Sequence, residues 1–307
     1  MMETAIASVV VPLDGSPLAA QALPIAAAVA GRAGCPLHLV RVLDHGVPAE
    51  TERRAEQALQ ETAAGLGADA QPQLHLRLGE AADQILAQAA ALPDPLVIMT
   101  THGRTGIGRW AFGSVADRVV RGGEAPVLLL RSGLAPAEIT PPFRTVLVPL
   151  DGSALAEAAL PQARALARLF AAELHLVRVA ETARLFMAPG MDAGLLATDL
   201  TQQLVDELER EARDYLEPVA ARTRADGLTV VSAVVDGIPV EALLAYASTH
   251  AVDLIVLATH GRGGFNRLVL GSVAERLLRL APTPVLMVPA AALDEVPLAE
   301  AGGAAEG

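Results

Sequence analysis

The sequence has 307 residues, which is enough for about two domains. Its net charge of −12 repels the phosphate backbones of DNA and RNA, so we expect no nucleic-acid partner. Cys35 is the only cysteine, which excludes an internal disulfide and indicates a reducing compartment. The N-terminus lacks the basic start of a secretory signal, and the longest uncharged stretch, residues 15–31, is too short to span a membrane. We therefore expect a cytoplasmic protein with no membrane partner.

The basic residues are all arginine, because the sequence contains no lysine. A P-loop binds phosphate through a lysine, and Schiff-base chemistry uses a lysine amine, so both are excluded. Apolar residues make up 52% of the chain and aromatic residues only 3%, which predicts an aliphatic core.

Strand and helix patterns alternate along the first part of the chain. Short apolar runs indicate buried strands, and the run at residues 95–101 is typical of a central parallel strand. Ser16 followed by Pro17 predicts the N-cap and the first position of a helix. The expected strands are residues 6–12, 36–43, 71–79, 95–101 and 125–131, and the expected helices are residues 17–33, 50–65, 81–91 and 114–121.

The second half of the chain repeats the first. VVVPLDGSPLAAQALP begins at residue 9 and VLVPLDGSALAEAALP at residue 146, so Asp14 corresponds to Asp151 at an offset of 137. Further along, Gly113 corresponds to Gly271 at an offset of 158, which gives the second copy 21 more residues (158 − 137) between its second and third strands. A longer helix is predicted there, at residues 199–225. A period this long indicates a duplicated domain rather than a solenoid.

This alternation predicts a parallel sheet with helices on both faces and right-handed crossovers. Because the pattern returns from residue 144 to residue 289, we predict two doubly wound parallel α/β sheets in tandem, each of about five strands. The domains are expected at residues 1–132 and 143–290, with a linker at residues 133–142 that is rich in proline and small residues. Residues 291–307 are rich in alanine, glycine and glutamate, and we expect them to form a disordered tail.

Two loops of each copy are candidates for a ligand site. Ligands bind open sheets of this kind beyond the carboxyl ends of the strands, where the strand order reverses. The first loop is PLDGS, and the second is MTTHGRTGIGRWAFGSVADR in one copy and LATHGRGGFNRLVLGSVAER in the other. Glycines allow the backbone to approach a ligand closely, and the N–H groups at the following helix start favour an anion such as phosphate.

The same residues also have a purely structural interpretation. Ser114 with Asp117, and Ser272 with Glu275, each fit a capping box that only starts a helix. Asp-Gly-Ser fits a tight turn in which the acid caps the helix. Neither copy has the clustering of His, Cys and Asp that a metal site requires, so no metal ligand is assigned. The pattern of residues by itself leaves both interpretations open.

Both halves resemble the universal stress proteins, over nearly the whole chain outside the linker and the tail. That family has flavodoxin-like, or Rossmann-like, sheets, and many of its ATP-binding members carry Gly-x2-Gly-x9-Gly-[Ser/Thr] after the fourth strand. The family's strand-one acid matches Asp14 and Asp151. The last three elements of the glycine motif match at two places, Gly103-x9-Gly113-Ser114 and Gly261-x9-Gly271-Ser272. The chain therefore looks like a tandem member, with two modules in one polypeptide.

The resemblance implies ATP as the bound ligand, with Mg²⁺ as an accompanying ion. It also implies that the strand-one acid hydrogen-bonds the adenine or the ribose, and that the Gly-Ser helix start holds the phosphates. The implied nucleotide-binding residues are Pro12, Asp14, Val42, Thr100, Gly103, Gly113, Ser114 and Val115 in the first copy and Pro149, Asp151, Val179, Ala258, Gly261, Gly271, Ser272 and Val273 in the second.

The sequence departs from the family pattern at the first glycine of the motif. Thr100 takes this position in the first copy and Ala258 takes it in the second. Alanine is small, whereas the β-branched threonine is expected to crowd the ribose or the phosphates. We therefore expect the second site to bind nucleotide better than the first.

The resemblance favours an ATP-binding regulatory protein of the stress response with at most slow hydrolysis, because no catalytic residue is evident. Two alternatives are an interaction scaffold of the same fold that binds no nucleotide, and a nucleotide-handling α/β enzyme. The apolar final strands are expected to pair antiparallel, as modules of this family do, which hides both sheet edges in an intramolecular pseudo-dimer. Further pairing of two chains into a homodimer stays open.

Overall fold

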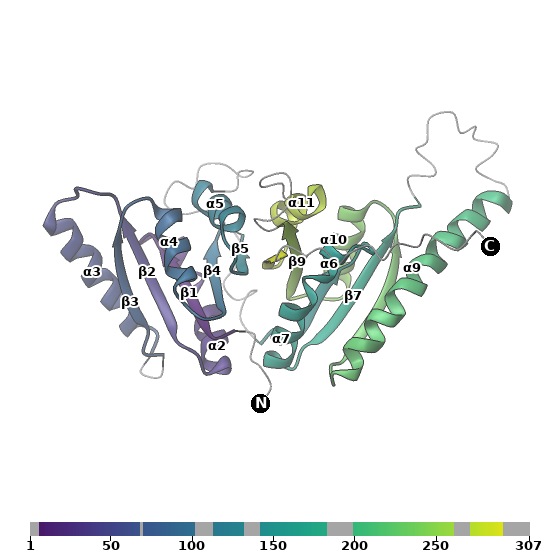
Figure 1. Ribbon diagram of the computed structural model, residues 1–307, viewed down its shortest axis with the longest axis horizontal. Coiled ribbons are helices and arrows are strands. Elements are labelled where there is room, and N and C mark those ends of the chain that lie inside the picture. Colours follow the sequence, from purple (N-terminus) through teal and green to yellow (C-terminus); the bar gives the residue numbers. More distant parts are fainter. Residues whose placement is uncertain are drawn as a thin grey trace, which may run out of the picture.

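The computed structural model describes residues 6–67, 70–101, 113–131, 142–182, 199–260 and 271–290. Their ten strands form one continuous sheet with helices against both faces (Figure 1). The tandem α/β architecture predicted from the sequence is confirmed, and the two expected sheets join into one. Most of the predicted linker, residues 133–141, and the whole predicted tail, residues 291–307, lie outside the described residues.

The first half has the predicted order of strands and helices, with one difference. The helix expected at residues 17–33 is divided into α1 (Pro17–Ala20) and α2 (Leu23–Ala33). Pro24 explains the division, because in a continuous helix its ring would clash with the carbonyl group of Ala20. The other elements are β1 (Ser8–Leu13), β2 (Leu37–Leu43), α3 (Ala49–Ala64), β3 (Gln73–Leu78), α4 (Ala81–Ala90), β4 (Pro95–Thr100), α5 (Ser114–Gly122) and β5 (Val127–Leu130).

The second half repeats this order with a longer helix. The helix α9 (Asp199–Ala225) has 27 residues, whereas α3 has 16, and it covers the range predicted from the insertion. Neither α9 nor any other helix in the described ranges has a stretch long and apolar enough to cross a membrane. The other elements are β6 (Thr145–Pro149), α6 (Ala154–Glu157), α7 (Leu160–Phe170), β7 (Glu173–Ala180), β8 (Val230–Asp236), α10 (Pro239–Thr249), β9 (Leu254–His260), α11 (Ser272–Leu280) and β10 (Val285–Ala290).

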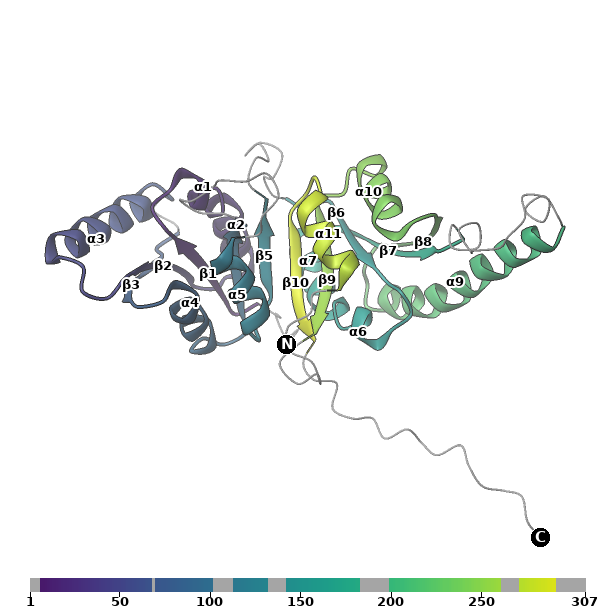
Figure 2. The same ribbon diagram turned by 90° about the horizontal axis from the view of Figure 1, so that it is seen from above.

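The strands follow the order β3-β2-β1-β4-β5-β10-β9-β6-β7-β8. Neighbouring strands within each half are parallel, whereas β5 and β10 pair antiparallel at the centre of the sheet, with Val127 opposite Met287 (Figure 2). This is the pairing of final strands that the resemblance implies. Because β5 and β10 are antiparallel, the strands of the first half and those of the second half have their carboxyl ends at opposite edges of the sheet. The strand order reverses between β1 and β4 in one half and between β6 and β9 in the other, which is where ligands bind in such sheets.

Each face of the sheet carries its own apolar core. One core contains Val9 and Val11 of β1 together with residues of α2, α3, α7 and α9. The other contains Val10 of the same strand together with residues of α4, α5, α10 and α11. Because successive side chains of a strand point to opposite faces, the continuous apolar run of β1 packs in both directions.

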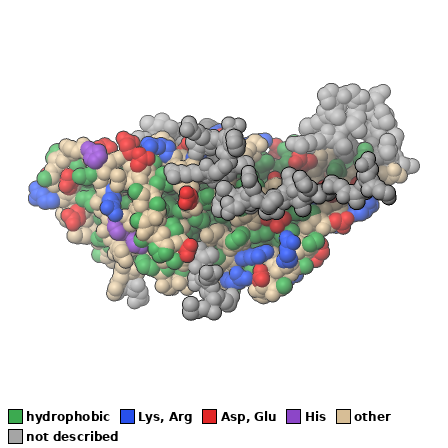
Figure 3. All heavy atoms as spheres, viewed as in Figure 1, with side chains coloured by type: hydrophobic (Ala, Val, Ile, Leu, Met, Phe, Trp, Pro, Cys, Tyr) green, Lys and Arg blue, Asp and Glu red, His purple; other side chains and the backbone are tan. Residues whose placement is uncertain are grey.

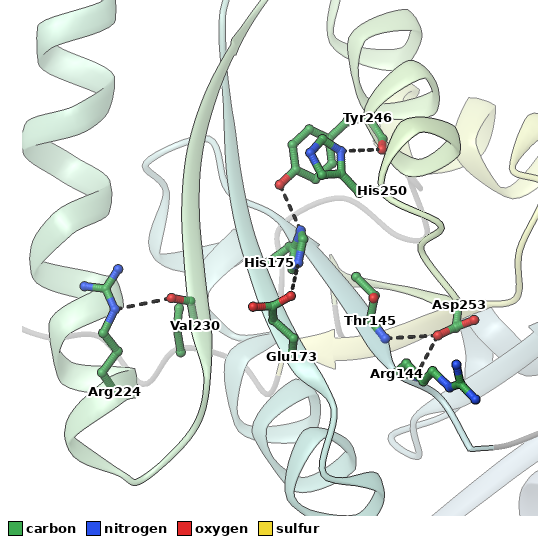
Figure 4. Close-up of polar contacts among 9 residues, drawn as sticks. All are labelled: Arg144, Thr145, Glu173, His175, Arg224, Val230, Tyr246, His250 and Asp253. Atoms are coloured by element: carbon green, nitrogen blue, oxygen red, sulfur yellow. Dashed lines mark hydrogen bonds and ion pairs between the residues drawn. The ribbon is translucent and has the colours of Figure 1, made fainter.

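A buried histidine lies at matching positions of β2 and β7, with different partners. Nδ1 of His38 lies 3.0 Å from Nε2 of His75 in β3. His175 instead lies between Glu173 and Tyr246, with Nε2 3.0 Å from the carboxylate and Nδ1 2.8 Å from the hydroxyl group (Figure 4). The duplicated position is therefore supported by a second imidazole in one half and by a carboxylate and a phenol in the other.

Candidate functional site

Each half contains a cavity at the carboxyl ends of its strands, at the point where the strand order reverses. The first has a volume of about 240 Å³ and the second about 230 Å³. Two predicted residues, Gly103 and Gly261, lie outside the described residues, and Ser272 does not line the second cavity. The other predicted residues line the cavities: Pro12, Asp14, Val42, Thr100, Gly113, Ser114 and Val115 in the first, and Pro149, Asp151, Val179, Ala258, Gly271 and Val273 in the second.

The strand-one acid of each half builds a tight turn. Oδ1 of Asp14 accepts a hydrogen bond from the backbone N–H of Ser16 at 2.8 Å, and Oδ1 of Asp151 accepts one from the N–H of Ser153 at 2.9 Å. The glycine between acid and serine has a φ of 80° in the first turn and 92° in the second, a conformation that disfavours any side chain. The sequence Asp-Gly-Ser thus fixes the carboxylate at the cavity wall.

The serine, and not the acid, caps the following helix. The hydroxyl oxygen of Ser16 accepts a hydrogen bond from the N–H of Ala19 at 3.1 Å, and that of Ser153 accepts one from Ala156 at 3.1 Å. Ser16 is the N-cap predicted from the sequence. The alternative in which the acid caps the helix is wrong, because the acid binds the N–H of the N-cap residue itself.

The Gly-Ser helix starts have no side-chain cap. The N-caps of α5 and α11 are Gly113 and Gly271, and neither N-cap residue forms a side-chain hydrogen bond with its helix. The capping-box interpretation is therefore wrong. Asp117 instead forms an ion pair with Arg121 one turn further along, and Glu275 does the same with Arg279. Within the described ranges, no side chain bonds the first-turn N–H groups of either helix, and such groups at the positive end of a helix suit an anion.

Among the residues that the structure describes, none fills the space beside the glycine at the second helix start. A Cβ placed on Gly271 would have no described neighbouring atom within 4 Å, apart from the adjacent residues. Its φ of −57° is one that any residue adopts. Glycine is therefore not required there by the backbone or by packing within the described residues, and its absent side chain leaves room at the cavity wall.

Thr100 does not make the first cavity smaller than the second. Its side chain is buried and lines the first cavity, as Ala258 lines the second. The two volumes nevertheless agree to within about 10 Å³. The expected difference in affinity between the sites therefore has no support from the volume of the cavities.

An arginine that the sequence did not single out lies beside each turn. A Cβ placed on Gly15 would lie 2.5 Å from Nη1 of Arg41, and this nitrogen donates to the carbonyl oxygen of Leu13 at 3.4 Å. In the second turn, a Cβ on Gly152 would lie 3.4 Å from Nη1 of Arg178. The repeat pairs the two arginines in sequence, but only the structure shows that they pack against the turns.

The second turn is linked to α9 through its arginine. Nη2 of Arg178 donates to Glu211 at 3.2 Å, and the guanidinium lies 4.9 Å from the centre of the Tyr215 ring. The hydroxyl group of Tyr215 donates to Glu157 of α6 at 3.0 Å. Burial and this bond to a carboxylate raise the pKa of Tyr215, so the phenol keeps its proton. The longer helix thus contacts elements on both sides of the second turn.

The charged side chains that line the cavities, among the described residues, are all acidic. They are Asp14 in the first cavity and Asp151 and Glu181 in the second. Acidic side chains are also spread over the face of the molecule shown in Figure 3, in keeping with the net charge of −12. Within the described ranges, no group of three or more His, Cys, Asp or Glu side chains is arranged to hold a metal ion. The backbone N–H groups are thus the part of each described cavity wall that suits an anion.

The model of the family described as the universal stress protein family matches the chain twice, at residues 6–131 and at residues 142–289. Each match covers one five-stranded half of the sheet.

Individual relatives give the same result. A universal stress protein of Methanocaldococcus jannaschii is 29% identical over 146 residues, which cover 48% of this chain and 82% of that protein. One of Mycobacterium tuberculosis is 28% identical over 192 residues, which cover 62% of this chain and 61% of that protein. The crystal structure of a universal stress protein from Archaeoglobus fulgidus covers 94% of this chain and 100% of its own, with a TM-score of 0.68 and 20% sequence identity. This last likeness bears on the fold alone.

Proposed function

Because the chain belongs to the universal stress protein family, we propose that it binds ATP in the cavity of each half and acts as a regulatory protein of the stress response. One observation carries the proposal. Each cavity brings a fixed carboxylate after the first strand together with a helix start that has no side-chain cap. A nucleotide needs both features, because its sugar and base offer hydrogen-bond donors and its phosphates are anions.

The order of the strands supports an orientation for the ligand in the second cavity. Gly271 and Val273 follow β9, Asp151 follows β6, and Val179 lies at the end of β7, in the spatial order β9-β6-β7. Phosphates at the start of α11 then place the ribose beside Asp151 and the base beside Val179. In the first cavity Val115, Asp14 and Val42 take the same three places.

Other parts of the proposal extend beyond the described cavity walls. Gly103 and Gly261 are proposed as phosphate-loop residues through the resemblance, and Mg²⁺ accompanies the phosphates without assigned protein ligands. No catalytic residue is assigned, so we expect at most slow hydrolysis. We also propose domains at residues 1–132 and 143–290 joined by residues 133–142, and the cytoplasmic location stays a prediction.

A second candidate function is an interaction scaffold that binds no nucleotide. The observation that favours it is Thr100, a buried side chain in the first cavity at the position where the family motif has glycine. Ala258 takes the same position in the second half, so both halves depart from the motif there. The two candidates differ in whether the purified protein carries a nucleotide.

The test is to purify the protein without added nucleotide, denature it, identify the released small molecules, and titrate emptied protein with ATP and Mg²⁺ by calorimetry. Released ATP or ADP, or saturable ATP binding, supports the proposal. An empty protein that gives no binding heat overturns it and favours the scaffold.

A matched pair of variants assigns the binding to the second cavity. Gly271→Val places methyl groups in the open space at the helix start, where a new Cβ meets no described atom. We expect it to lose binding at the second site while the protein stays folded. Gly31→Val is the control, because Gly31 also has open space around its Cβ and lies in α2 away from both cavities. Unchanged binding in Gly271→Val would contradict the assignment.

A further inference from the structure

The second cavity has a carboxylate that the first lacks. Val177 and Val179 line it as alternate residues of β7, and Glu181, two positions on, continues the same face. In the first half Val40 and Val42 line the cavity in the same way. The next residue of that series, Asp44, is exposed and does not line the first cavity.

The residue after Glu181 is held in place at the end of β7. Thr182 is 2% exposed, its N–H donates to the carbonyl oxygen of Ala180 at 2.8 Å, and its hydroxyl group donates to the carboxylate of Asp236 at the end of β8. These bonds hold the backbone at Thr182, directly after Glu181, where the chain leaves β7. In the first half the positions of Thr182 and Asp236 are taken by His45 and Leu78, which cannot form this pair.

Glu181 lies at the end of the cavity that is farthest from the proposed phosphate site. The phosphate-binding N–H groups follow β9, and Glu181 follows β7, two strands away in the order β9-β6-β7. Neighbouring strands are about 4.8 Å apart, so this separation is about 10 Å. Asp151 follows β6 between them. A nucleotide with its phosphates at α11 and its ribose at Asp151 therefore has its base beside Glu181.

The walls at this end suit a flat ring with a hydrogen-bond donor. Val179 and Leu243 of α10 supply apolar surface, and a carboxylate only accepts hydrogen bonds. We propose that Glu181 makes the second site selective for the base, by accepting a hydrogen bond from the exocyclic amino group of adenine. This inference rests on the proposed function. The first site, where Asp44 lies outside the cavity, lacks this selection.

The experiment compares ATP with purine riboside 5′-triphosphate, which differs only in having hydrogen in place of the 6-amino group. Both are titrated calorimetrically into the protein carrying Gly113→Val, which adds a side chain to the wall of the first cavity and is expected to block it. We expect the second site to bind ATP about tenfold more tightly than the analogue, the value of one hydrogen bond to a charged acceptor. Glu181→Ala should reduce this ratio to within about twofold.

Two further variants separate recognition from general damage. Thr182→Val removes the hydroxyl group that bonds Asp236, and we expect it to lower the ratio in part, because Glu181 is then less well positioned. Asp44→Ala, measured in protein carrying Gly271→Val so that only the first site is open, should leave the ratio of that site unchanged.

The outcomes distinguish the two proposals. If ATP binds but Glu181→Ala weakens ATP and the analogue equally, or leaves the ratio unchanged, the inference about Glu181 is overturned and the proposed function stands. If neither nucleotide binds when both cavities are unsubstituted, the proposed function itself is overturned.

Discussion

The two halves of the chain build the same turn beside different neighbours. In the first half the guanidinium of Arg41 lies directly against the turn glycine and donates to Leu13. In the second half Arg178 donates to Glu211 and stacks on Tyr215, both in α9, and lies further from the turn. The insertion that lengthens α9 therefore also changes the surroundings of the second cavity. Duplication preserves the backbone of the site, and in the second copy the longer helix contributes Glu211 and Tyr215 as neighbours of the arginine.

The buried histidines show the same kind of divergence away from the cavities. His38 and His75 provide each other's polar contact, whereas His175 contacts a carboxylate and a phenol. Burial and the neighbouring imidazole of His75 lower the pKa of His38, so the first pair resists protonation in the folded chain. The first half should therefore be sensitive to acid.

The largest difference in stability between the two halves is expected when the glycine of each turn is replaced. Gly15→Ala should lower the free energy of unfolding by about 2–3 kcal/mol, and Gly152→Ala by about 1–2 kcal/mol. Both residues have positive φ, but only at Gly15 would the new Cβ lie so close to the guanidinium that the arginine must shift. Urea unfolding of both variants measures the difference. Equal losses, or a larger loss at Gly152, would contradict the account of Arg41.

Acid is expected to destabilise the protein through the histidine pair of the first half. Burial lowers the pKa of His38 below 6.5 and that of His75 likewise, with repulsion from His75 and Arg77 adding to the shifts. Above pH 6.5 the two histidines are neutral in both the folded and the unfolded chain. Below pH 6.5 they take up protons in the unfolded chain, whereas in the folded chain their lowered pKa values keep them neutral. Stability should thus fall as the pH drops below 6.5, by up to about 1.4 kcal/mol per pH unit for each histidine.

Unfolding by urea at pH 7.5, 6.5 and 5.5 measures this loss. The variant His75→Gln removes one imidazole of the pair and should make the dependence on pH shallower. The same dependence in the variant as in the original chain would show that the loss arises elsewhere.

Breaking the link between the second turn and α9 is expected to lower the stability of the protein moderately. Tyr215→Phe removes the hydrogen bond to Glu157 and keeps the ring beneath Arg178, so it should lower the free energy of unfolding by about 1 kcal/mol. The double variant Tyr215→Phe with Glu157→Gln should lose little more than Glu157→Gln alone. Full additivity of the two losses would mean that the hydroxyl group and the carboxylate do not act as a pair.

The smallest effects are expected at the acids that the sequence suggested as part of capping boxes. Asp117→Ala and Glu275→Ala each remove an ion pair between residues one helical turn apart. Each should lower the free energy of unfolding by about 0.3–0.5 kcal/mol. Loss of a true cap would cost about 1 kcal/mol or more. Thermal unfolding of both variants distinguishes these values, and a loss of the larger size in either half would restore the capping-box interpretation there.

The fold was predictable because its signals are local. Alternating strand and helix patterns and the repeated offset were enough for two parallel α/β halves, and α9 has the bounds that were predicted. The division of the helix at residues 17–33 was missed, although Pro24 marks it. The pairing of β5 with β10 came from the resemblance, since an apolar strand does not show in its sequence which strand it will contact.

The site was predictable only in part, because some of its contacts join distant residues. The turn acids and the Gly-Ser helix starts stand out as motifs, and the structure brings most of them to one cavity in each half. The capping boxes were misread because the pattern of serine and acid does not reveal that the preceding glycine is the N-cap. Glu181 could not be found from sequence, because it belongs to neither motif and only the structure shows that it lines the second cavity.

The most direct test is an experimental structure of the protein with ATP and Mg²⁺. We predict density for the nucleotide in the second cavity, with a phosphate within hydrogen-bonding distance of the backbone N–H groups of Ser272 and Val273, and with the base beside Val179. A second cavity filled by protein side chains, with Asp151 turned away from it, would contradict the central claim.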